Sequence, residues 1–378
     1  MFEDIRPFHD DETQAVLKET LNDPALAKAI GSWFAPGLNR KAKWFIRPLI
    51  RWALKVYFWR VKTIEGFQNR LAPFVARLLK RSVESFSVHG LEKLEKNKAY
   101  LFVSNHRDIV MDPAMVNWAL HQNGFTTVRI SIGDNLLTQP FSSNLMRLNK
   151  SFIVKRGLTG MKVRYKAAQE LSKYIHYSIL EEQANIWIAQ REGRAKDGYD
   201  RTNSAVISMF SLSKPKTREY SDYINELNIV PVAISYELDP LDIAKAKELH
   251  AITTNGSYKK RKNEDMTSIA RGMTGWKGRV HLEFGDVLQG DFASDDDVAA
   301  VIDEQIHRIY RPFETNEWAE AQLENKPYQV SNSNVEALVK RVELAKDDLK
   351  PYLLRQYANG MRMQRGQGPL AAVQVDRE

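Results

Sequence analysis

The residues best suited to chemistry follow one short apolar segment, Tyr100–Val103. His106 comes just after this segment, and two carboxylates, Asp108 and Asp112, follow it closely. A neutral histidine whose second ring nitrogen is fixed by a carboxylate can take a proton from a hydroxyl group. The same pattern also has a structural interpretation, because Asp112-Pro113 is typical of a helix N-cap followed by a first-turn proline. The spacing alone leaves both a catalytic and a structural histidine open.

Other chemistries have less support in the sequence. The 378-residue chain contains no cysteine, which excludes disulfides, thiolate metal sites and cysteine nucleophiles. Its eight histidines form no pair with metal-ligand spacing, and no Gly-x-Ser-x-Gly elbow, Walker loop or dinucleotide fingerprint is present. We therefore expect no metal ion and no bound cofactor. A chain of this composition is also expected in a reducing compartment.

The positive charge of the chain is concentrated in one segment. The formal net charge is +8, and residues 40–82 hold twelve basic side chains against one acid, Glu65. At about 100° per residue, Arg47, Arg51 and Lys55 share a helical arc of about 80°, with Pro48 expected in the first turn. The rest of the circumference is mostly apolar or aromatic, which is typical of a helix in a bilayer interface and not of a nucleic-acid binder. The alternative is a helix packed on the core with three solvated charges.

The surrounding pattern predicts the elements that position these residues. Residues before about 86 have a helical pattern, and apolar β-prone runs then alternate with helical stretches such as 161–182 and 295–310. The expected strands are Tyr100–Val103, Val128–Ile132, Phe152–Val154, Asn185–Ala189, Ile229–Ser235 and Val280–Phe284. This order indicates an α/β fold with a largely parallel sheet flanked by helices, and with N- and C-terminal helical extensions. Functional groups are then expected in the loops at strand ends.

We expect four regions along the chain. Residues 1–85 are expected to form a helical, basic-aromatic region that docks on a membrane, and residues 86–312 the α/β core. Residues 313–358 are expected to be helical, and residues 359–378 to form a flexible tail. No stretch of about 20 residues lacks charge, so we expect no conventional spanning helix.

Four segments, in order, resemble the motifs of the glycerolipid acyltransferase family, which includes glycerol-3-phosphate and lysophosphatidic acid acyltransferases. They are Leu101–Pro113, Ser151–Arg156, Glu192–Arg194 and Ile229–Ser235, and the resemblance covers about residues 86–290. Two details depart from the family pattern. Five residues instead of four separate His106 from Asp112, so Asp108 is a rival partner. Arg194 follows the Glu-Gly pair directly, whereas the family usually has one residue between them.

The resemblance implies a general-base acyltransferase of phospholipid biosynthesis or remodelling. His106 would be the catalytic base and Asp112 its partner, acting without a serine nucleophile or a covalent acyl-enzyme. The residues implied in substrate binding are Arg107, Lys155, Arg156, Glu192, Gly193 and Arg194. Pro231 belongs to the apolar strand of the fourth segment, and Glu192 has two open interpretations, orienting Arg194 or capping a helix.

The same resemblance implies the partners. The acyl donor would be acyl-CoA or an acyl-carrier protein, used as co-substrate, and the acceptor a lipid precursor with a hydroxyl and a phosphate. The protein is expected at the cytoplasmic face of a membrane, as a peripheral or monotopic protein on an anionic surface. No nucleic acid is expected as a partner. The alternative function is a non-catalytic basic module that binds membrane or nucleic acid.

Overall fold

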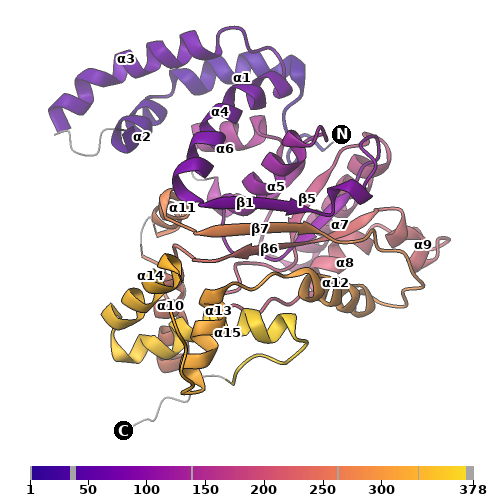
Figure 1. Ribbon diagram of the computed structural model, residues 1–378. Coiled ribbons are helices and arrows are strands. Elements are labelled where there is room, and N and C mark those ends of the chain that lie inside the picture. The colour runs from indigo at the N-terminus through magenta and orange to yellow at the C-terminus, as the bar shows by residue number, and fades with distance from the viewer. Residues whose placement is uncertain (1, 35–39, 138, 262–263, 331, 372–378) are drawn as a thin grey trace. The chain divides into compact units, whose positions relative to one another are not determined.

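The computed structural model describes residues 2–34, 40–137, 139–261, 264–330 and 332–371, with side chains for all of these except 32–34 and 40–43. The chain divides into two compact units (Figure 1). The N-terminal unit comprises residues 1–75 and 128–174, and the C-terminal unit comprises residues 76–127 and 175–378.

Five neighbouring strands form the centre of the C-terminal unit. In spatial order its strands are β1 (Ser85–His89), β7 (Arg279–Phe284), β6 (Ile229–Tyr236), β2 (Leu101–Ser104) and β5 (Ile186–Ala189). All neighbours are parallel except β6 and β7, which run antiparallel. The strands β2 and β6 are buried along their whole length, as expected for central strands that are covered on both faces. The predicted α/β fold with a largely parallel sheet is confirmed.

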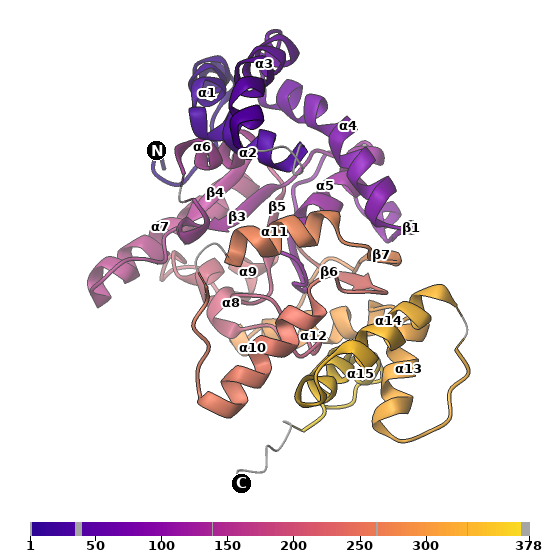
Figure 2. The same cartoon turned by 90° about the vertical axis from the view of Figure 1, so that its left-hand side faces the viewer.

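Helices surround this sheet and continue beyond it. They are α5 (Met111–Gln122), α8 (Ser204–Ser211), α9 (Tyr220–Asn225), α10 (Asp242–Asn255), α11 (Glu264–Thr274), α12 (Asp295–Ile309), α13 (Glu314–Leu323), α14 (Ser333–Leu344) and α15 (Lys350–Gln364). The helix α12 packs on β6 and is capped by Ser294, whose side chain accepts a hydrogen bond from the Asp297 amide. The helices α10, α13, α14 and α15 lie together (Figure 2) around a core that includes Leu338, Tyr352 and Tyr357.

The N-terminal unit combines helices with a strand pair. Its helices are α1 (Asp10–Asn22), α2 (Pro24–Phe34), α3 (Arg40–Phe58) and α6 (Pro140–Leu148), and its parallel strands are β3 (Arg129–Gly133) and β4 (Ser151–Val154). Two further helices, α4 (Ile64–Ser82) and α7 (Met161–Leu180), cross the division between the units along the sequence. The core of this unit includes Leu17, Phe58 and Phe67. Asp23 starts α2 by accepting the Ala25 amide through its side chain (2.7 Å).

The helix α3 turns its most apolar side outward. Its exposed large side chains, between 49% and 72% accessible, are Trp44, Phe45, Leu49, Trp52 and Val56, and Trp59 directly after the helix is 66% accessible. Arg47 and Arg51 are half-buried, and an Nη of Arg51 donates to the Asn22 carbonyl (2.8 Å). Compared with the alternative expectation, a helix packed on the core with three solvated charges, α3 does place Phe58 in the core, but of the three charges only Lys55 is exposed. Within the described ranges, no helix has the length and apolarity to span a bilayer.

The structure differs from the sequence-based expectation at four points. The strand β1 was not predicted, because its Ser-rich sequence at the sheet edge carries few apolar residues. Pro48 lies inside α3 and not in its first turn, since the helix already begins at Arg40. The helix α15 continues through the predicted start of the tail, where Asn359 is fully buried and bonds to the Leu370 amide. Residues 128–174, expected in the α/β core, belong to the N-terminal unit.

Candidate active site

His106 and Asp112 form a hydrogen-bonded pair at the carboxyl end of β2. His106 lies two residues beyond the strand, and Asp112 lies in the first turn of α5. The distance from His106 Nδ1 to Asp112 Oδ2 is 2.8 Å, and the exposed side-chain fractions are 13% and 0%. The rival Asp108 instead accepts the backbone amides of Val110 and Met111 (3.0 and 2.9 Å). The structure therefore pairs His106 with Asp112, and Asp108 stabilises the start of α5.

Backbone amides and a tyrosine hold Asp112 in place. Its Oδ2 also accepts the amides of Arg107 (2.6 Å) and Asp108 (2.9 Å), and its Oδ1 accepts the Tyr236 hydroxyl (2.8 Å). A carboxylate at Nδ1 favours the tautomer that carries its proton there, which leaves the Nε2 lone pair available. Nε2 makes no hydrogen bond to any described residue. The His106 side chain, 13% exposed, thus has a ring nitrogen that is free to accept a proton.

Asn105 joins the two strands beneath the histidine. The ladder between β2 and β6 ends at the pair Ser104 and Val232. The Asn105 side chain continues it, because its Oδ1 accepts the Ile234 amide (2.8 Å) and its Nδ2 donates to the Ile234 carbonyl (3.0 Å). On the other side of β2, the Trp187 ring of β5 lies 5.9 Å from the His106 ring, edge to face. These two contacts fix the backbone and the ring of the candidate base.

Arg107 is committed to a buried ion pair. One of its Nη atoms donates to Asp200 Oδ2 (2.6 Å) and to the Gly198 carbonyl (3.2 Å), and both side chains of the pair are less than one-tenth exposed. Burial raises the pKa of Asp200, and the Arg107 charge acts against that rise. Asn105 Nδ2 also donates to this carboxylate (3.0 Å). The pairing favours a structural role for Arg107, and its predicted part in acceptor binding stays a prediction.

The Glu192–Arg194 segment lies against the His106 loop. The amide of Ala195 donates to the His106 carbonyl (3.0 Å), and the amide of Gln190 donates to the Ser104 carbonyl (2.8 Å). The loop after β5 therefore lies beside the loop after β2. Glu192 and Gly193 are exposed, and the positive φ of Gly193 (74°) favours glycine at this turn. The structure brings this predicted segment and the predicted base together.

Arg194 itself is half-buried and makes no hydrogen bond or ion pair to any described residue. The positive charge of Arg194 acts on the pKa of Asp239. Burial acts to raise the pKa of Asp239, but Lys245 and more weakly Arg194 hold it below the usual range. Arg194 thus belongs to a loop whose backbone is bonded to the His106 loop, and its hydrogen-bond donors are unused by the described part of the protein.

The remaining predicted residues have other surroundings. Lys155 and Arg156 belong to the N-terminal unit, where Lys155 pairs with Asp4 (3.2 Å) and the Arg156 amide donates to Asp134 (3.2 Å). Their predicted roles in acceptor binding stay predictions. Pro231 lies in β6, and its carbonyl accepts the Gly285 amide (2.8 Å). Among the described residues, no group of three or more His, Asp or Glu side chains is arranged to hold a metal ion.

Three residues of the site, Asn105, Trp187 and Tyr236, were not predicted from the sequence. Asn105 and Trp187 lie inside or beside the predicted motif segments, and Tyr236 directly follows the fourth segment. The available signal was their place at the ends of apolar strands, since parallel strand ends meet at one edge of a sheet. That signal does not say which strands are neighbours, and only the strand order brings Tyr236 next to Asp112.

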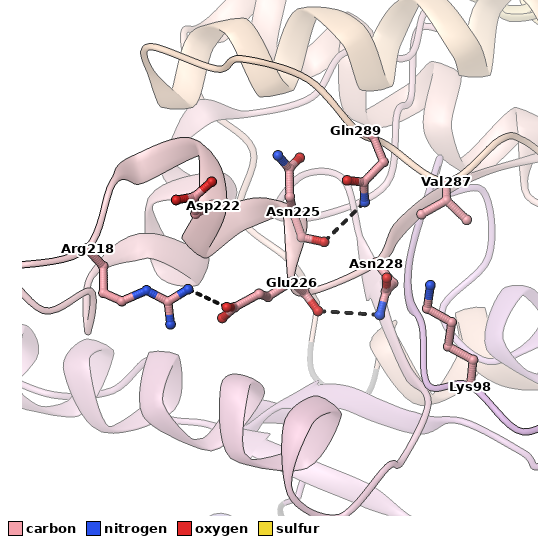
Figure 3. A pocket seen from close by; sticks show the side chains of 8 residues that line it. All are labelled: Lys98, Arg218, Asp222, Asn225, Glu226, Asn228, Val287 and Gln289. Carbon is pink, nitrogen blue, oxygen red and sulfur yellow. Dashed lines mark hydrogen bonds and ion pairs between the residues drawn. The ribbon is translucent and has the colours of Figure 1, made fainter.

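A polar cavity of about 630 Å³ lies elsewhere in the C-terminal unit (Figure 3). Lys98 precedes β2 and Asn228 precedes β6, so the cavity lies at the amino ends of these parallel strands, opposite the edge that carries His106. An ion pair between Arg218 and Glu226 crosses it. The cavity is therefore separate from the candidate active site.

The fold and the site define a class: an α/β protein with a histidine at a strand end that is hydrogen-bonded to a buried aspartate. The acyltransferase family model matches residues 85–235, which include His106, Asp112, Arg194 and Pro231. This match confirms the predicted resemblance and the prediction of an acyltransferase enzyme.

The crystal structure of the 1-acyl-sn-glycerophosphate (LPA) acyltransferase PlsC from Thermotoga maritima is similar at 15% sequence identity and a TM-score of 0.40. The alignment covers 70% of this chain and 89% of that chain. No curated protein sequence matches the chain. A likeness at this level does not decide the substrate.

Proposed function

We propose that the protein transfers a fatty acyl group from an acyl-CoA or acyl-carrier-protein thioester to a hydroxyl group of a glycerol-phosphate or lysophospholipid-type acceptor. The observation that carries this proposal is the His106 ring, with Nδ1 bonded to Asp112 and Nε2 unoccupied by the described residues. The acyltransferase domain supports the reaction class. The glycerolipid acceptor is supported by the four motif segments and by Arg194. Such a reaction belongs to phospholipid biosynthesis or remodelling.

The proposed reaction proceeds by direct transfer. His106 Nε2 takes the proton of the acceptor hydroxyl while the oxygen attacks the thioester carbonyl carbon. The buried Asp112 carboxylate stabilises the imidazolium that forms. The carbon–sulfur bond then breaks, the new ester is released, and the leaving thiolate recovers the proton from Nε2. No other group of the protein has to become covalently bound to the acyl chain.

We assign recognition of the acceptor phosphate to Arg194. A guanidinium presents two parallel N–H donors that match two phosphate oxygens. Arg194 is next to Ala195, whose amide is bonded to the His106 carbonyl, so an acceptor held by Arg194 would have its hydroxyl near the base. Arg107 is a weaker candidate because Asp200 already occupies its guanidinium.

We also propose that α3 docks the protein on the cytoplasmic face of a membrane. Six large apolar side chains from Trp44 to Trp59 are about half or more exposed, and Lys55 and Arg60 lie among them. Tryptophan rings favour the headgroup level of a bilayer, and basic groups favour anionic lipid phosphate. A surface of this composition supports a peripheral or monotopic protein on an anionic membrane.

The experiment that tests the proposed function replaces His106 with Ala. Acyl transfer is expected to fall by at least about 10²-fold, the low end for loss of a general base, with the fold intact by circular dichroism. Lipid analysis of cells that overproduce either protein would identify the acceptor. Wild-type turnover in folded His106→Ala protein contradicts the proposal and favours the alternative of a non-catalytic basic module.

A further inference from the structure

The two oxygens of Asp112 have different tasks. Oδ2 faces the active-site loop and accepts His106 Nδ1 and the amides of Arg107 and Asp108. Oδ1 faces the other way and accepts the Tyr236 hydroxyl at 2.8 Å, which is its one hydrogen bond within the described ranges. Because the Asp112 side chain is 0% exposed, water does not compete for this oxygen. Tyr236 therefore supplies the hydrogen bond that holds Oδ1 of the carboxylate in place.

Tyr236 reaches Asp112 from a separate part of the fold. It is the last residue of β6, while His106 follows β2 and Asp112 belongs to α5. The Tyr236 hydroxyl also lies 3.7 Å from the sulfur of Met115, one turn further along α5. The side chains of Tyr236, Asp112 and His106 thus form a chain of hydrogen bonds that runs from β6 through α5 to the loop after β2.

We propose that Tyr236 is a positioning residue for the reaction, acting on His106 through Asp112. This inference rests on the proposed function of His106 as the base. The hydroxyl donates to Oδ1, limits rotation of the carboxylate about its Cβ–Cγ bond, and thereby keeps Oδ2 aligned with Nδ1. It touches neither substrate, because it lies buried behind Asp112.

The hydroxyl stays a donor across the working pH range. Burial, followed by the charge of Asp112, raises the pKa of Tyr236 well above its ordinary value. The phenol therefore keeps its proton, and Asp112 is the acceptor. A donor to a carboxylate also favours the ionised form of that carboxylate, which is the form that stabilises the imidazolium.

Removal of this donor has a predictable sign. Without the hydroxyl, the negative charge of Asp112 is less delocalised into hydrogen bonds and attracts the imidazolium of His106 more strongly. The imidazolium is then favoured over the neutral ring, and the acidic limb of kcat/KM, which follows the neutral base, moves to higher pH. At the same time kcat falls because the ring is less well oriented, while both KM values stay unchanged.

Other charges near Asp112 are the same in the wild type and in the variants. The groups that interact electrostatically with Asp112, Tyr236 or both are Asp108, Asp239, Arg107 and Lys277. Their contributions to the pH dependence of kcat/KM cancel when the pH profiles of the wild type and a variant are compared. Only the missing hydroxyl then accounts for a difference in the acidic limb.

Tyr357 provides a matched control. Its hydroxyl donates to the buried carboxylate of Asp242 (2.7 Å), and its ring is as buried as that of Tyr236, at 4% against 6% exposed. Asp242 pairs with Arg341 (2.8 Å) and has no histidine partner. Tyr357→Phe therefore removes the same kind of bond, together with the acceptor of the Asp239 amide (3.1 Å), and no bond of His106 or Asp112.

The experiment compares Tyr236→Phe, Tyr357→Phe and wild-type protein. Tyr236→Phe is expected to lower kcat about 10-fold and to move the acidic limb upward by about one pH unit, as for a bond to a charged group. Tyr357→Phe is expected to keep the wild-type limb. NMR titration of the His106 ring should show the same upward shift without any turnover measurement.

Two outcomes overturn the inference. One is an unchanged acidic limb and His106 titration in folded Tyr236→Phe, and the other is an equal shift in Tyr357→Phe. If Tyr236→Phe does not fold, 3-fluorotyrosine at position 236 replaces it: the more acidic phenol is a stronger donor and should move the limb to lower pH, and no movement overturns the inference. Activity surviving in His106→Ala would instead contradict the proposed function, so the two failures are distinguishable.

Discussion

Gly272 lies directly against the carboxylate of Asp108. A Cβ atom placed at residue 272 would come within 1.8 Å of Asp108 Oδ2, which no real pair of atoms tolerates. Asp108 in turn accepts the amides at the start of α5, the helix that carries Asp112. The helix α11 therefore limits where the loop between His106 and Asp112 can lie.

Gly272→Ala should lower both stability and activity. Alanine normally favours a helix over glycine by about 1 kcal/mol, but here the overlap with Asp108 forces the loop to move and costs about 1–3 kcal/mol. Urea unfolding and kcat measurements check this. Gly31→Ala in α2 is the control, because its Cβ would meet Ile50 at an ordinary 3.4 Å. Unchanged activity in Gly272→Ala would show that the Asp108 loop adapts.

Asp112→Asn should reduce turnover by about 10²-fold or more, whereas Asp108→Asn should be mild. The amide of an asparagine at 112 cannot offer two acceptor oxygens to its four donors and cannot stabilise an imidazolium as a carboxylate does. An asparagine at 108 keeps one oxygen for the Val110 and Met111 amides. Steady-state kinetics of both folded variants decide the point. A severe Asp108→Asn with a mild Asp112→Asn would reverse the assignment.

Arg194→Lys should raise the acceptor KM, and Arg194→Ala should raise it further, because a lysine offers a point charge in place of a fork. Loss of a charge-assisted hydrogen bond costs about 1.5–3 kcal/mol, or roughly 10- to 150-fold in kcat/KM for the acceptor. The donor KM should change little. An acceptor without phosphate is the control, since wild type and variant should use it equally poorly. Equal impairment with both acceptors would make Arg194 structural.

Replacement of Trp44, Trp52 and Trp59 with Ala should release the protein from vesicles that contain anionic lipid. These rings are 62–66% exposed, so their loss should affect membrane burial and not the core. Gln at Arg47, Arg51 and Lys55 should release less protein, and salt should only loosen binding. Vesicle flotation measures this. Wild-type protein that stays with the soluble fraction would contradict membrane docking through α3.

Acid should destabilise the protein through His176. Burial lowers its pKa to about 4, with its ring stacked 3.8 Å from that of Tyr223 and Nε2 bonded to the Phe210 carbonyl (2.9 Å). The unfolded chain binds this proton near pH 6.5, so the stability contributed by neutral His176 is present above that pH and declines toward pH 4. The loss is on the order of 3 kcal/mol.

His176→Phe is the test of this pH dependence. The variant should be less stable at pH 7, because the hydrogen bond to Phe210 is lost, but its stability should decline less between pH 6.5 and pH 4. Urea unfolding at several pH values in this window compares the two slopes. Parallel slopes would show that His176 does not carry the acid sensitivity.

The strands of the sheet could be predicted because each is a short apolar run between polar loops. All six predicted strands are present, and β2, β5 and β6 are nearly fully buried. The strand β1 was missed because an edge strand needs only one apolar face, and Ser85–His89 offers little even there. Burial on both faces leaves a clear pattern in the sequence, and burial on one face leaves a weak one.

The candidate base was predictable, but its surroundings were not. The order of His106 and its carboxylates is visible in the sequence, whereas the choice between Asp108 and Asp112 depends on where α5 begins. Tyr236 is 130 residues from His106 in the sequence, and no local pattern marks it. Its role follows from the parallel pairing of β2 with β6, which is a property of the folded chain.

The support of Asp112 by main-chain amides also matters for directed evolution. Two of the three hydrogen bonds to Oδ2 come from the amides of residues 107 and 108, and these donors survive any substitution there except proline. The half-buried Ile109 and Val110 supply no side chain to that support. A library that varies these two positions can therefore reshape the surroundings of the His106 ring while the geometry of the base persists.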